Sequence, residues 1–340
     1  MLREHLLQGI EDYVAGDGFR QDMGLGRGEI KVRFLAQGEY NLNYLLGTEK
    51  GKYVLRINTA SQMELENQIA YEYQALELLA DSLVTPRPFY LDDSKQVIPY
   101  GLLVMEYLPG APLDYGQDLV KAAQTFAKIH SLTFEEGRTN FLVPGSEPFS
   151  GIYQEAAGLL ERFFQCPEAD PQVRGILEKV LTAAEVKKKA EKYIVNEPRR
   201  VVINTEVNSH NFIVNNERLT CHLIDWEKPI LGDPAQDLSM FLIATTTMWK
   251  RNYLLSREEE EQFLKEYLKR LKPCSGEKTL RDKVAMFKFF NYLRAISWCA
   301  MAWTEYTKPG RLLVNMDTFE KIKIYLDVRF IKNCFPDVFK

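Results

Sequence analysis

Short β-prone runs dominate the first hundred residues, and glycine-containing turns separate them. The predicted strands cover residues 32–35, 43–46, 53–57 and 102–105. Between the third and the fourth strand, residues 62–80 carry apolar side chains at helical spacing, which predicts one helix. The first part of the chain is therefore expected to be rich in strands.

The pattern changes near Leu108, where a Leu-Pro-Gly sequence breaks the chain. Beyond it, apolar side chains recur at helical spacing in long segments. These segments are residues 118–130, 151–164, 172–190, 257–271 and 280–303. One β-prone island, residues 201–225, interrupts them. We predict an α+β fold with a small β-rich N-terminal lobe of residues 1–108 and a larger, mainly helical C-terminal lobe of residues 109–340. Such an arrangement suits a nucleotide held between two lobes.

The composition excludes some classes of protein but does not indicate a function. The chain has 340 residues, 46% of them hydrophobic and 26% charged, which is typical of a globular protein. Its length favours two domains or lobes, because single hydrophobic cores stop growing at about 250–300 residues. The 43 Lys and Arg residues against 47 Asp and Glu residues give a net charge of −4, whereas a dedicated nucleic-acid-binding protein usually carries a basic face. We therefore expect no nucleic-acid partner.

Cysteine spacing and hydropathy bear on the compartment. The five cysteines form no CxxC pair, which indicates reduced thiols in a reducing environment. The N-terminal residues lack the apolar segment of a secretion signal, and Lys288 and Arg294 interrupt the most apolar stretch, residues 284–303. The expectation is a cytoplasmic protein that does not interact with a membrane. The sequence does not indicate an oligomeric state.

Candidate chemistry is concentrated in the β-prone island. Two apolar strands, residues 212–214 and 221–224, flank a short turn. A hairpin of this length places Asn211, just before the first strand, beside Asp225, just after the second. An amide oxygen and a carboxylate are suited to Mg²⁺ and its bound phosphates. Glu206 can bring a second carboxylate to the same point, as a base that faces an acceptor hydroxyl.

The island resembles the catalytic region of the aminoglycoside phosphotransferase and choline kinase-like family, whose members are relatives of protein kinases. The pattern of that family is close to H-G-D-x-x-x-x-N-F followed by I-D-W-E-x-x-x-x-G-D-P-x-x-D-L. Here residues 204–212 read N-T-E-V-N-S-H-N-F, and residues 224–238 read I-D-W-E-K-P-I-L-G-D-P-A-Q-D-L. The second half matches almost letter for letter. In the first half, Asn204 replaces the histidine and Glu206 replaces the catalytic aspartate.

The resemblance implies a protein-kinase-like fold and phosphoryl transfer. Asn211 and Asp225 would hold Mg²⁺, Glu206 would accept the hydroxyl proton, and Asp237 would brace the backbone of the catalytic loop. Glutamate extends the carboxylate by one methylene, so a working site needs a compensating backbone shift. The intact metal-ligand positions favour such a site, because metal and positioning supply most of the catalysis in phosphoryl transfer.

The resemblance extends into the N-terminal lobe. Gly38 and Asn41 lie in a segment like the family's turn over the nucleotide, where glycine lets the backbone approach phosphate closely. Arg56 stands where the family has its phosphate-pairing lysine, and Glu72 matches the helix glutamate that orients this cation. Taken alone, the glycine is typical of an ordinary hairpin, and the Arg56–Glu72 pair is typical of a solvated surface. The downstream motif favours the functional interpretation.

The connection between the lobes resembles the family's adenine-binding segment. Backbone groups near Glu106 and Leu108 would form hydrogen bonds to the purine. Backbone groups can bind a purine whatever the side chains are, so the sequence does not distinguish the two purines. ATP and GTP are both candidates.

The sequence thus predicts a small-molecule kinase that uses Mg²⁺ to transfer the γ-phosphoryl group of ATP or GTP to a hydroxyl of a small metabolite. Two alternatives stay open: a nucleotide-binding pseudokinase that serves as a scaffold or regulator, and a nucleotidyl transferase on the same fold.

The acceptor is less defined. Aromatic side chains in the C-terminal helices could form a cage for a cation, although packing between helices is the more common reason for them. Residues 1–108 carry 10 Lys and Arg against 16 Asp and Glu, so the acid excess lies outside the lobe that would hold the acceptor. This distribution favours a less charged metabolite alcohol over a polycationic aminoglycoside.

Overall fold

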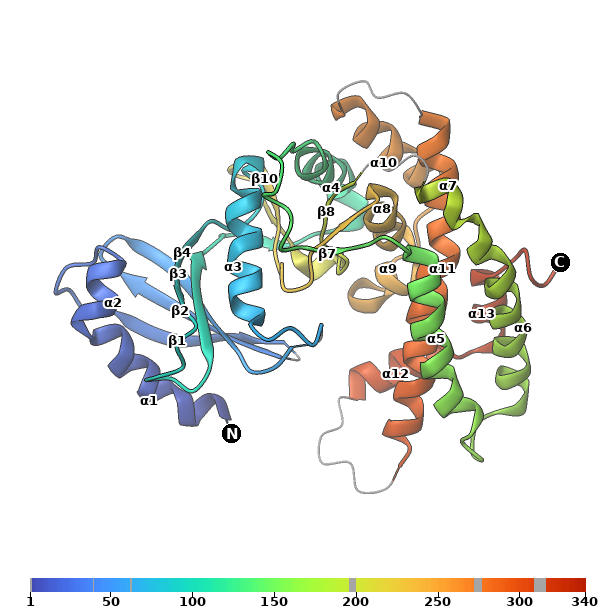
Figure 1. Ribbon diagram of the computed structural model, residues 1–340, viewed down its shortest axis with the longest axis horizontal. Helices are drawn as coiled ribbons and strands as arrows, with labels where there is room; N and C mark the ends of the chain where they lie inside the picture. The colour runs from blue at the N-terminus through green and yellow to red at the C-terminus, as the bar shows by residue number, and fades with distance from the viewer. Residues whose placement is uncertain (1, 39, 62, 196–199, 272–276, 309–315) are drawn as a thin grey trace.

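The structure is a computed structural model and describes residues 2–38, 40–61, 63–195, 200–271, 277–308 and 316–340. Figure 1 shows a part built around a β-sheet at the N-terminal end and a larger, mainly helical part beyond it. The predicted α+β architecture, with a β-rich N-terminal region and a helical C-terminal region, is confirmed.

The strands and helices follow the chain in this order. The strands are β1 (Lys31–Gln37), β2 (Asn41–Thr48), β3 (Gly51–Asn58), β4 (Pro88–Asp92), β5 (Gly101–Glu106), β6 (Ala111–Pro112), β7 (Val143–Pro144), β8 (Val201–Ile203), β9 (Phe212–Asn215), β10 (Thr220–Leu223) and β11 (Ile230–Gly232). The α-helices are α1 (Leu2–Ala15), α2 (Asp17–Asp22), α3 (Gln68–Leu79), α4 (Tyr115–His130), α5 (Pro148–Phe164), α6 (Pro171–Lys187), α7 (Glu191–Val195), α8 (Pro234–Leu242), α9 (Ala244–Arg251), α10 (Arg257–Arg270), α11 (Glu277–Tyr306), α12 (Met316–Tyr325) and α13 (Val328–Cys334).

The N-terminal sheet has five antiparallel strands in the order β1-β2-β3-β5-β4. Successive side chains of a strand point to opposite faces. In β5, Leu102 and Val104 therefore pack in the same cluster as side chains of α1 and α2, whereas Leu103 and Met105 pack with α3. Both faces of this strand are buried, which explains why its sequence is continuously apolar and does not alternate between apolar and polar residues.

Helix α3 is shorter than the sequence pattern predicts. The prediction of residues 62–80 is wrong at its start, because α3 begins at Gln68. Asn67 caps it, and its Oδ1 accepts a hydrogen bond from the Ala70 N–H at 3.2 Å. Gln62 lies outside the described residues. Glu72 lies on this helix and is buried.

The connection after β5 packs directly on the hairpin that carries the candidate chemistry. β6 pairs with β9, and a Cβ at Gly110 would lie 2.4 Å from the Val214 carbonyl oxygen. Only glycine fits this approach. The main hydrophobic cluster also joins residues on both sides of Leu108, so the division into lobes at that residue stays a prediction.

The hairpin of β9 and β10 has the register that the sequence indicates, with Phe212 opposite Leu223. At its open end the Ile224 N–H donates to the Asn211 carbonyl at 2.8 Å, which brings Asn211 and Asp225 to the same end. β8 pairs with β11, and Asn204, which follows β8, donates its side-chain N–H to the Asp225 carbonyl, so the loop that starts at Asn204 lies beside this end.

The helices of the C-terminal region pack around α11, which contacts α5, α8 and α12. Within the parts of the chain that the structure describes, no helix is both long enough and apolar enough to cross a membrane.

Candidate active site

Asp237, in the first turn of α8, holds the loop that follows β8. Its fully buried carboxylate accepts hydrogen bonds from the Asn204 N–H at 2.7 Å and the Thr205 N–H at 2.8 Å. Thr205 has a φ of 69°, which is rare for a β-branched residue, and it occupies the glycine position of the H-G-D pattern. Its hydroxyl also donates to the Lys228 carbonyl at 3.0 Å. This geometry suits the bracing role predicted for Asp237.

Asn204 links the two loops that carry the carboxylates. Its Oδ1 accepts from the Glu206 N–H at 3.0 Å, and its Nδ2 donates to the Asp225 carbonyl at 2.9 Å. The side chain is fully buried, so both of its polar ends need partners, and both have them. Asparagine at this position therefore ties the Glu206 loop to the Asp225 loop.

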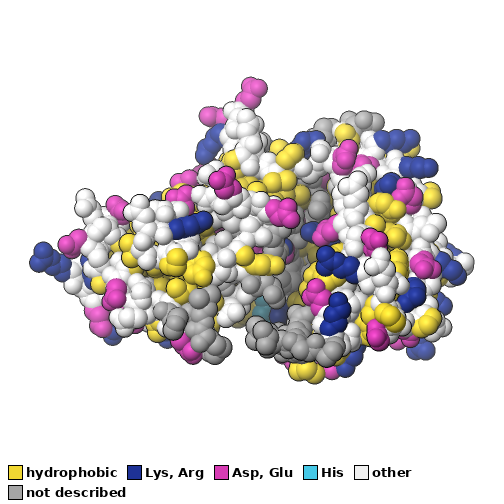
Figure 2. All heavy atoms as spheres, turned by 60° about the horizontal axis from the view of Figure 1, so that its bottom comes forward, with side chains coloured by type: hydrophobic (Ala, Val, Ile, Leu, Met, Phe, Trp, Pro, Cys, Tyr) yellow, Lys and Arg dark blue, Asp and Glu magenta, His cyan; other side chains and the backbone are white. Residues whose placement is uncertain are grey.

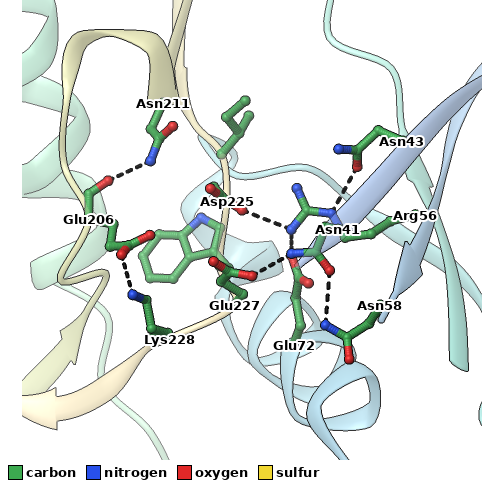
Figure 3. Close-up of polar contacts among 12 residues, drawn as sticks. Asn41, Asn43, Arg56, Asn58, Glu72, Glu206, Asn211, Asp225, Glu227 and Lys228 are labelled. Carbon is green, nitrogen blue, oxygen red and sulfur yellow. Dashed lines mark hydrogen bonds and ion pairs between the residues drawn. The ribbon is translucent and has the colours of Figure 1, made fainter. Parts of the chain in front are cut away.

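Three carboxylates meet in the space between these loops (Figure 3). Oxygen atoms of Glu206, Asp225 and Glu227 all lie within 4.8 Å of one another. Burial and the charges of Asp225 and Glu206 raise the pKa of Glu227 to about 7. Such a cluster of like charges favours a bound cation, and carboxylates are the ligands that Mg²⁺ prefers.

Asn211 completes the set of oxygen donors at this position. Its Nδ2 donates to the Glu206 carbonyl at 2.6 Å, which leaves its Oδ1 as the side-chain atom suited to a metal. The donor set fits Mg²⁺, and the metal-binding roles of Asn211 and Asp225 stay predictions.

Glu227 was missed as a site residue by the sequence reasoning. It lies two positions after Asp225 in the I-D-W-E motif, and the intervening Trp226 is fully buried. That spacing, with a large apolar residue between two acids, was a signal that both carboxylates share one side of the chain.

Arg56 joins the N-terminal sheet to the carboxylate cluster (Figure 3). One Nη atom lies 2.6 Å from Oε1 of Glu72 and 2.9 Å from Oδ1 of Asp225, and Nε donates to Oδ1 of Asn43 at 3.0 Å. Burial raises the pKa of Glu72, and the charge of Arg56 opposes that rise. Arg56 is 6% exposed and Glu72 is 1% exposed, so a solvated surface pair is the wrong interpretation of these two residues.

Lys228 forms an ion pair with Glu206 (Figure 3). The lysine side chain is mostly buried, which limits the directions that the glutamate carboxylate can take. The sequence reasoning did not identify Lys228, because only the folded path between β10 and β11 places it opposite the catalytic loop.

Asn41, at the start of β2, links the turn between β1 and β2 to the carboxylate cluster. The Asn41 amide donates to Glu227, and the Asn58 amide donates to Asn41 Oδ1 at 3.0 Å. The Gly38 N–H donates to the Asn41 carbonyl at 2.9 Å, and a Cβ at Gly38 would contact only that carbonyl, at 3.9 Å. Packing therefore does not require glycine at this position. The nucleotide-binding roles of Gly38 and Asn41 stay predictions, and Glu39 lies outside the described residues.

The predicted adenine-binding segment lies at the end of β5. The Glu106 N–H donates to the Arg87 carbonyl at 2.8 Å, and its side chain is exposed, whereas Leu108 is half-buried. Figure 2 shows the molecular surface hollowed between the sheet-containing part and the helical part. The roles of Glu106 and Leu108 stay predictions.

Comparison with known proteins identifies the family of this chain. The sequence pattern of the phosphotransferase enzyme family, APH, matches residues 31–286, which include every candidate residue above. The chain belongs to this family. A search of curated protein sequences finds no match.

Solved structures share the fold over nearly the whole chain. The spectinomycin phosphotransferase APH(9)-Ia, in complex with ADP and spectinomycin, superposes with a TM-score of 0.65 and 13% identity, covering 97% of this chain and 98% of its own. Choline kinase LicA from Streptococcus pneumoniae superposes with a TM-score of 0.60 and 19% identity, covering 97% of this chain and 99% of its own. A choline kinase from Cryptosporidium parvum Iowa II superposes with a TM-score of 0.62 and 13% identity, covering 97% of this chain and 95% of its own. The predicted resemblance to aminoglycoside phosphotransferases and choline kinases, and the kinase-like fold, are confirmed.

The raised pKa of Glu227 in this phosphotransferase predicts how stability depends on pH. From the ordinary value of 4.5 up to about 7, the folded protein holds a proton that the unfolded chain has released. The free energy of unfolding therefore falls as the pH rises through this window, by about 1–3 kcal/mol from this group. Urea unfolding with a metal chelator, at about pH 5 and about pH 8, measures the change. Glu227→Gln should show a smaller decrease in the free energy of unfolding between these two pH values. An equal decrease in both proteins would contradict a raised pKa of Glu227 as its cause.

Proposed function

We propose that this protein transfers the terminal phosphoryl group of ATP or GTP, with Mg²⁺, to a hydroxyl group of a small molecule. The observation that carries the proposal is the contact of Arg56 with Asp225. It puts a buried guanidinium, a group that pairs with phosphate, beside a cluster of metal-binding oxygens. The family and the ADP-bound spectinomycin phosphotransferase support the same assignment.

The geometry supports the following division of roles. Arg56, oriented by Glu72, would pair with the phosphates of the nucleotide. Asp225 and Asn211 would hold Mg²⁺, and Glu227 lies close enough to contribute a third ligand. A Mg²⁺ ion held by these residues would supply positive charge that offsets the negative charge of the nucleotide phosphates.

Glu206 is the proposed acceptor of the hydroxyl proton. Two features compensate for its extra methylene relative to aspartate. Asn204 holds the Glu206 backbone N–H, and Lys228 holds the carboxylate by an ion pair. Both contacts restrict the position of the carboxylate, and such restriction is what general base catalysis requires.

Glu206→Gln tests this role directly. The amide keeps nearly the same shape but cannot accept the proton, so we expect kcat to fall by about 10²–10⁴-fold. Nucleotide affinity measured at saturating Mg²⁺ should stay unchanged, because the side chain is not proposed to contact the nucleotide. Glu217→Gln is the matched control, since Glu217 is exposed at the far end of the same hairpin. Unchanged turnover in Glu206→Gln would exclude Glu206 as the base.

Two measurements separate the proposal from its alternatives. Thermal unfolding with ATP or GTP and Mg²⁺ should show stabilisation, which at a hundredfold excess over Kd amounts to about 2.7 kcal/mol. Phosphate transfer is then screened over amino sugars, choline-like alcohols, sugars and nucleosides. Stabilisation without transfer to any acceptor or to water would favour a pseudokinase, and transfer of the nucleotidyl group would favour a nucleotidyl transferase. No stabilisation by either nucleotide would contradict all three.

A further inference from the structure

A cavity of about 470 Å³ lies in the helical region, among residues other than those of the candidate active site. Its walls come from the end of α6, the short 3₁₀ turn η2 (Lys188–Ala190), α7, the first half of α11 and the start of α5. Figure 1 shows these helices grouped at the end of the molecule away from the sheet. The volume lies within the range of small-molecule sites.

Apolar side chains of α5 and α11 form one wall of the cavity. Phe149 of α5 stacks on Phe290 of α11 with ring centroids 4.3 Å apart and an interplanar angle of 8°. Met286 and Phe289 extend this apolar surface along α11. Ala190 and Ala285 face the same space with small side chains, which leaves room for a ligand.

Three lysines lie along the wall of the cavity that α6, η2 and α7 form. Lys187, Lys189 and Lys192 all line the cavity. The Lys187 ammonium lies 5.2 Å from the centre of the Phe289 ring, and that of Lys192 lies 5.2 Å from the Tyr193 ring. Lys187 and Lys192 therefore each lie over an aromatic ring that lines the cavity.

The nearby carboxylates are already engaged. Glu191, next to these lysines, accepts from the Phe149 N–H at 2.7 Å, the Ser150 N–H at 2.9 Å and the Ser150 hydroxyl at 2.7 Å, which caps α5. Asp337, which lines the cavity, binds Lys340 at 2.9 Å. The charge that faces the cavity is therefore predominantly positive.

We propose that this cavity binds a small amphipathic anion, with its apolar body against Met286 and Phe289 and its phosphate or carboxylate head among Lys187, Lys189 and Lys192. The chemistry of the lining is complementary to such a ligand at both ends. Val186 and Tyr193 add to the apolar surface at the mouth, where they are 62% and 59% exposed. The inference does not depend on the proposed catalytic function.

Calorimetric titration of the full chain with n-octyl phosphate, below its micelle concentration, tests the proposal. Octyl phosphate should bind saturably at one site. Octyltrimethylammonium, with the same tail, and inorganic phosphate, with no tail, should each bind at least about tenfold more weakly, which corresponds to about 1.4 kcal/mol. Equal binding of the cationic amphiphile, or no binding of octyl phosphate, would overturn the proposal.

Variants locate the binding. Lys189→Glu/Lys192→Glu should weaken octyl phosphate by about tenfold or more, because it reverses charge at two exposed positions of the cavity. Ala285→Trp, at an exposed position of α11, fills the cavity and should abolish binding. Lys179→Glu, an exposed position of α6 outside the cavity lining, is the matched control and should bind like the unmodified chain. Unchanged binding by Ala285→Trp would place the ligand elsewhere and overturn the proposal.

Vesicles distinguish a discrete ligand from a membrane surface. Sedimentation with phosphatidylserine or phosphatidylcholine vesicles is compared with the calorimetric result. Binding of monomeric octyl phosphate that Ala285→Trp removes supports the discrete site. Sedimentation with the anionic vesicles alone, without binding of octyl phosphate, would instead assign the lysine-rich surface to membranes and overturn the proposal.

Discussion

Replacing Arg56 by methionine is expected to lower the free energy of unfolding by about 3–5 kcal/mol, because removing one partner of a buried ion pair leaves the other charge uncompensated. Arg56 is the shared cation of Glu72, which is 1% exposed, and of Asp225. Methionine retains an apolar side chain of similar length, so loss of packing is small. Urea-induced unfolding of the two proteins measures the difference.

A second variant shows whether charge is the cause. Arg56→Met/Glu72→Gln removes the buried carboxylate that the single variant leaves unpaired. It should therefore be more stable than Arg56→Met, with a coupling energy of about 1–3 kcal/mol. Equal urea midpoints for Arg56→Met and the unmodified chain would contradict the buried ion-pair network.

Replacing Asp225 by asparagine is expected to lower kcat by about a thousandfold, a change of about 4 kcal/mol in the activation free energy. The amide can still accept a hydrogen bond from Arg56, so the contact with the N-terminal sheet is kept in part. What is lost is the negative charge beside Glu206 and Glu227 that favours a divalent ion. Turnover measured against Mg²⁺ concentration should show the loss even at saturating metal.

Glu217→Gln is again the control, because it removes one carboxylate from the same hairpin at an exposed position. It should leave both kcat and the Mg²⁺ dependence unchanged. An Asp225→Asn variant that keeps its metal-dependent turnover would show that Asp225 does not hold the ion.

Much of the fold could be predicted from local patterns. Strand-length and helix-length periodicities separate a β-rich N-terminal part from a helical part, and the apolar run of β5 marks a strand buried on both faces. The start of α3 was placed too early, since apolar residues before Gln68 continue the spacing while Asn67 caps the helix. A cap is a local hydrogen bond that overrides periodicity.

The candidate site was predictable where the chemistry is local in sequence. The short β9–β10 hairpin by itself brings Asn211 to Asp225. The contacts of Glu227 with Asn41 and of Lys228 with Glu206 join segments through tertiary packing, so no spacing in the sequence indicates them. The burial of Arg56 and Glu72 is likewise a property of the fold, because the same two residues on an exposed surface would have the same sequence.

The most direct test of phosphoryl transfer uses ATP and GTP, each radioactively labelled at either the α- or the γ-phosphate. Each labelled nucleotide is incubated with Mg²⁺, the protein and a pool of amino sugars, amino alcohols, sugars and nucleosides, with water as the default acceptor. The γ-label should appear in an organic phosphate or in inorganic phosphate, the α-label should stay in the nucleotide, and Asp225→Asn should lose the transfer. Label from the α-position in the product, no release of the γ-label, or equal transfer by Asp225→Asn would contradict the proposed site.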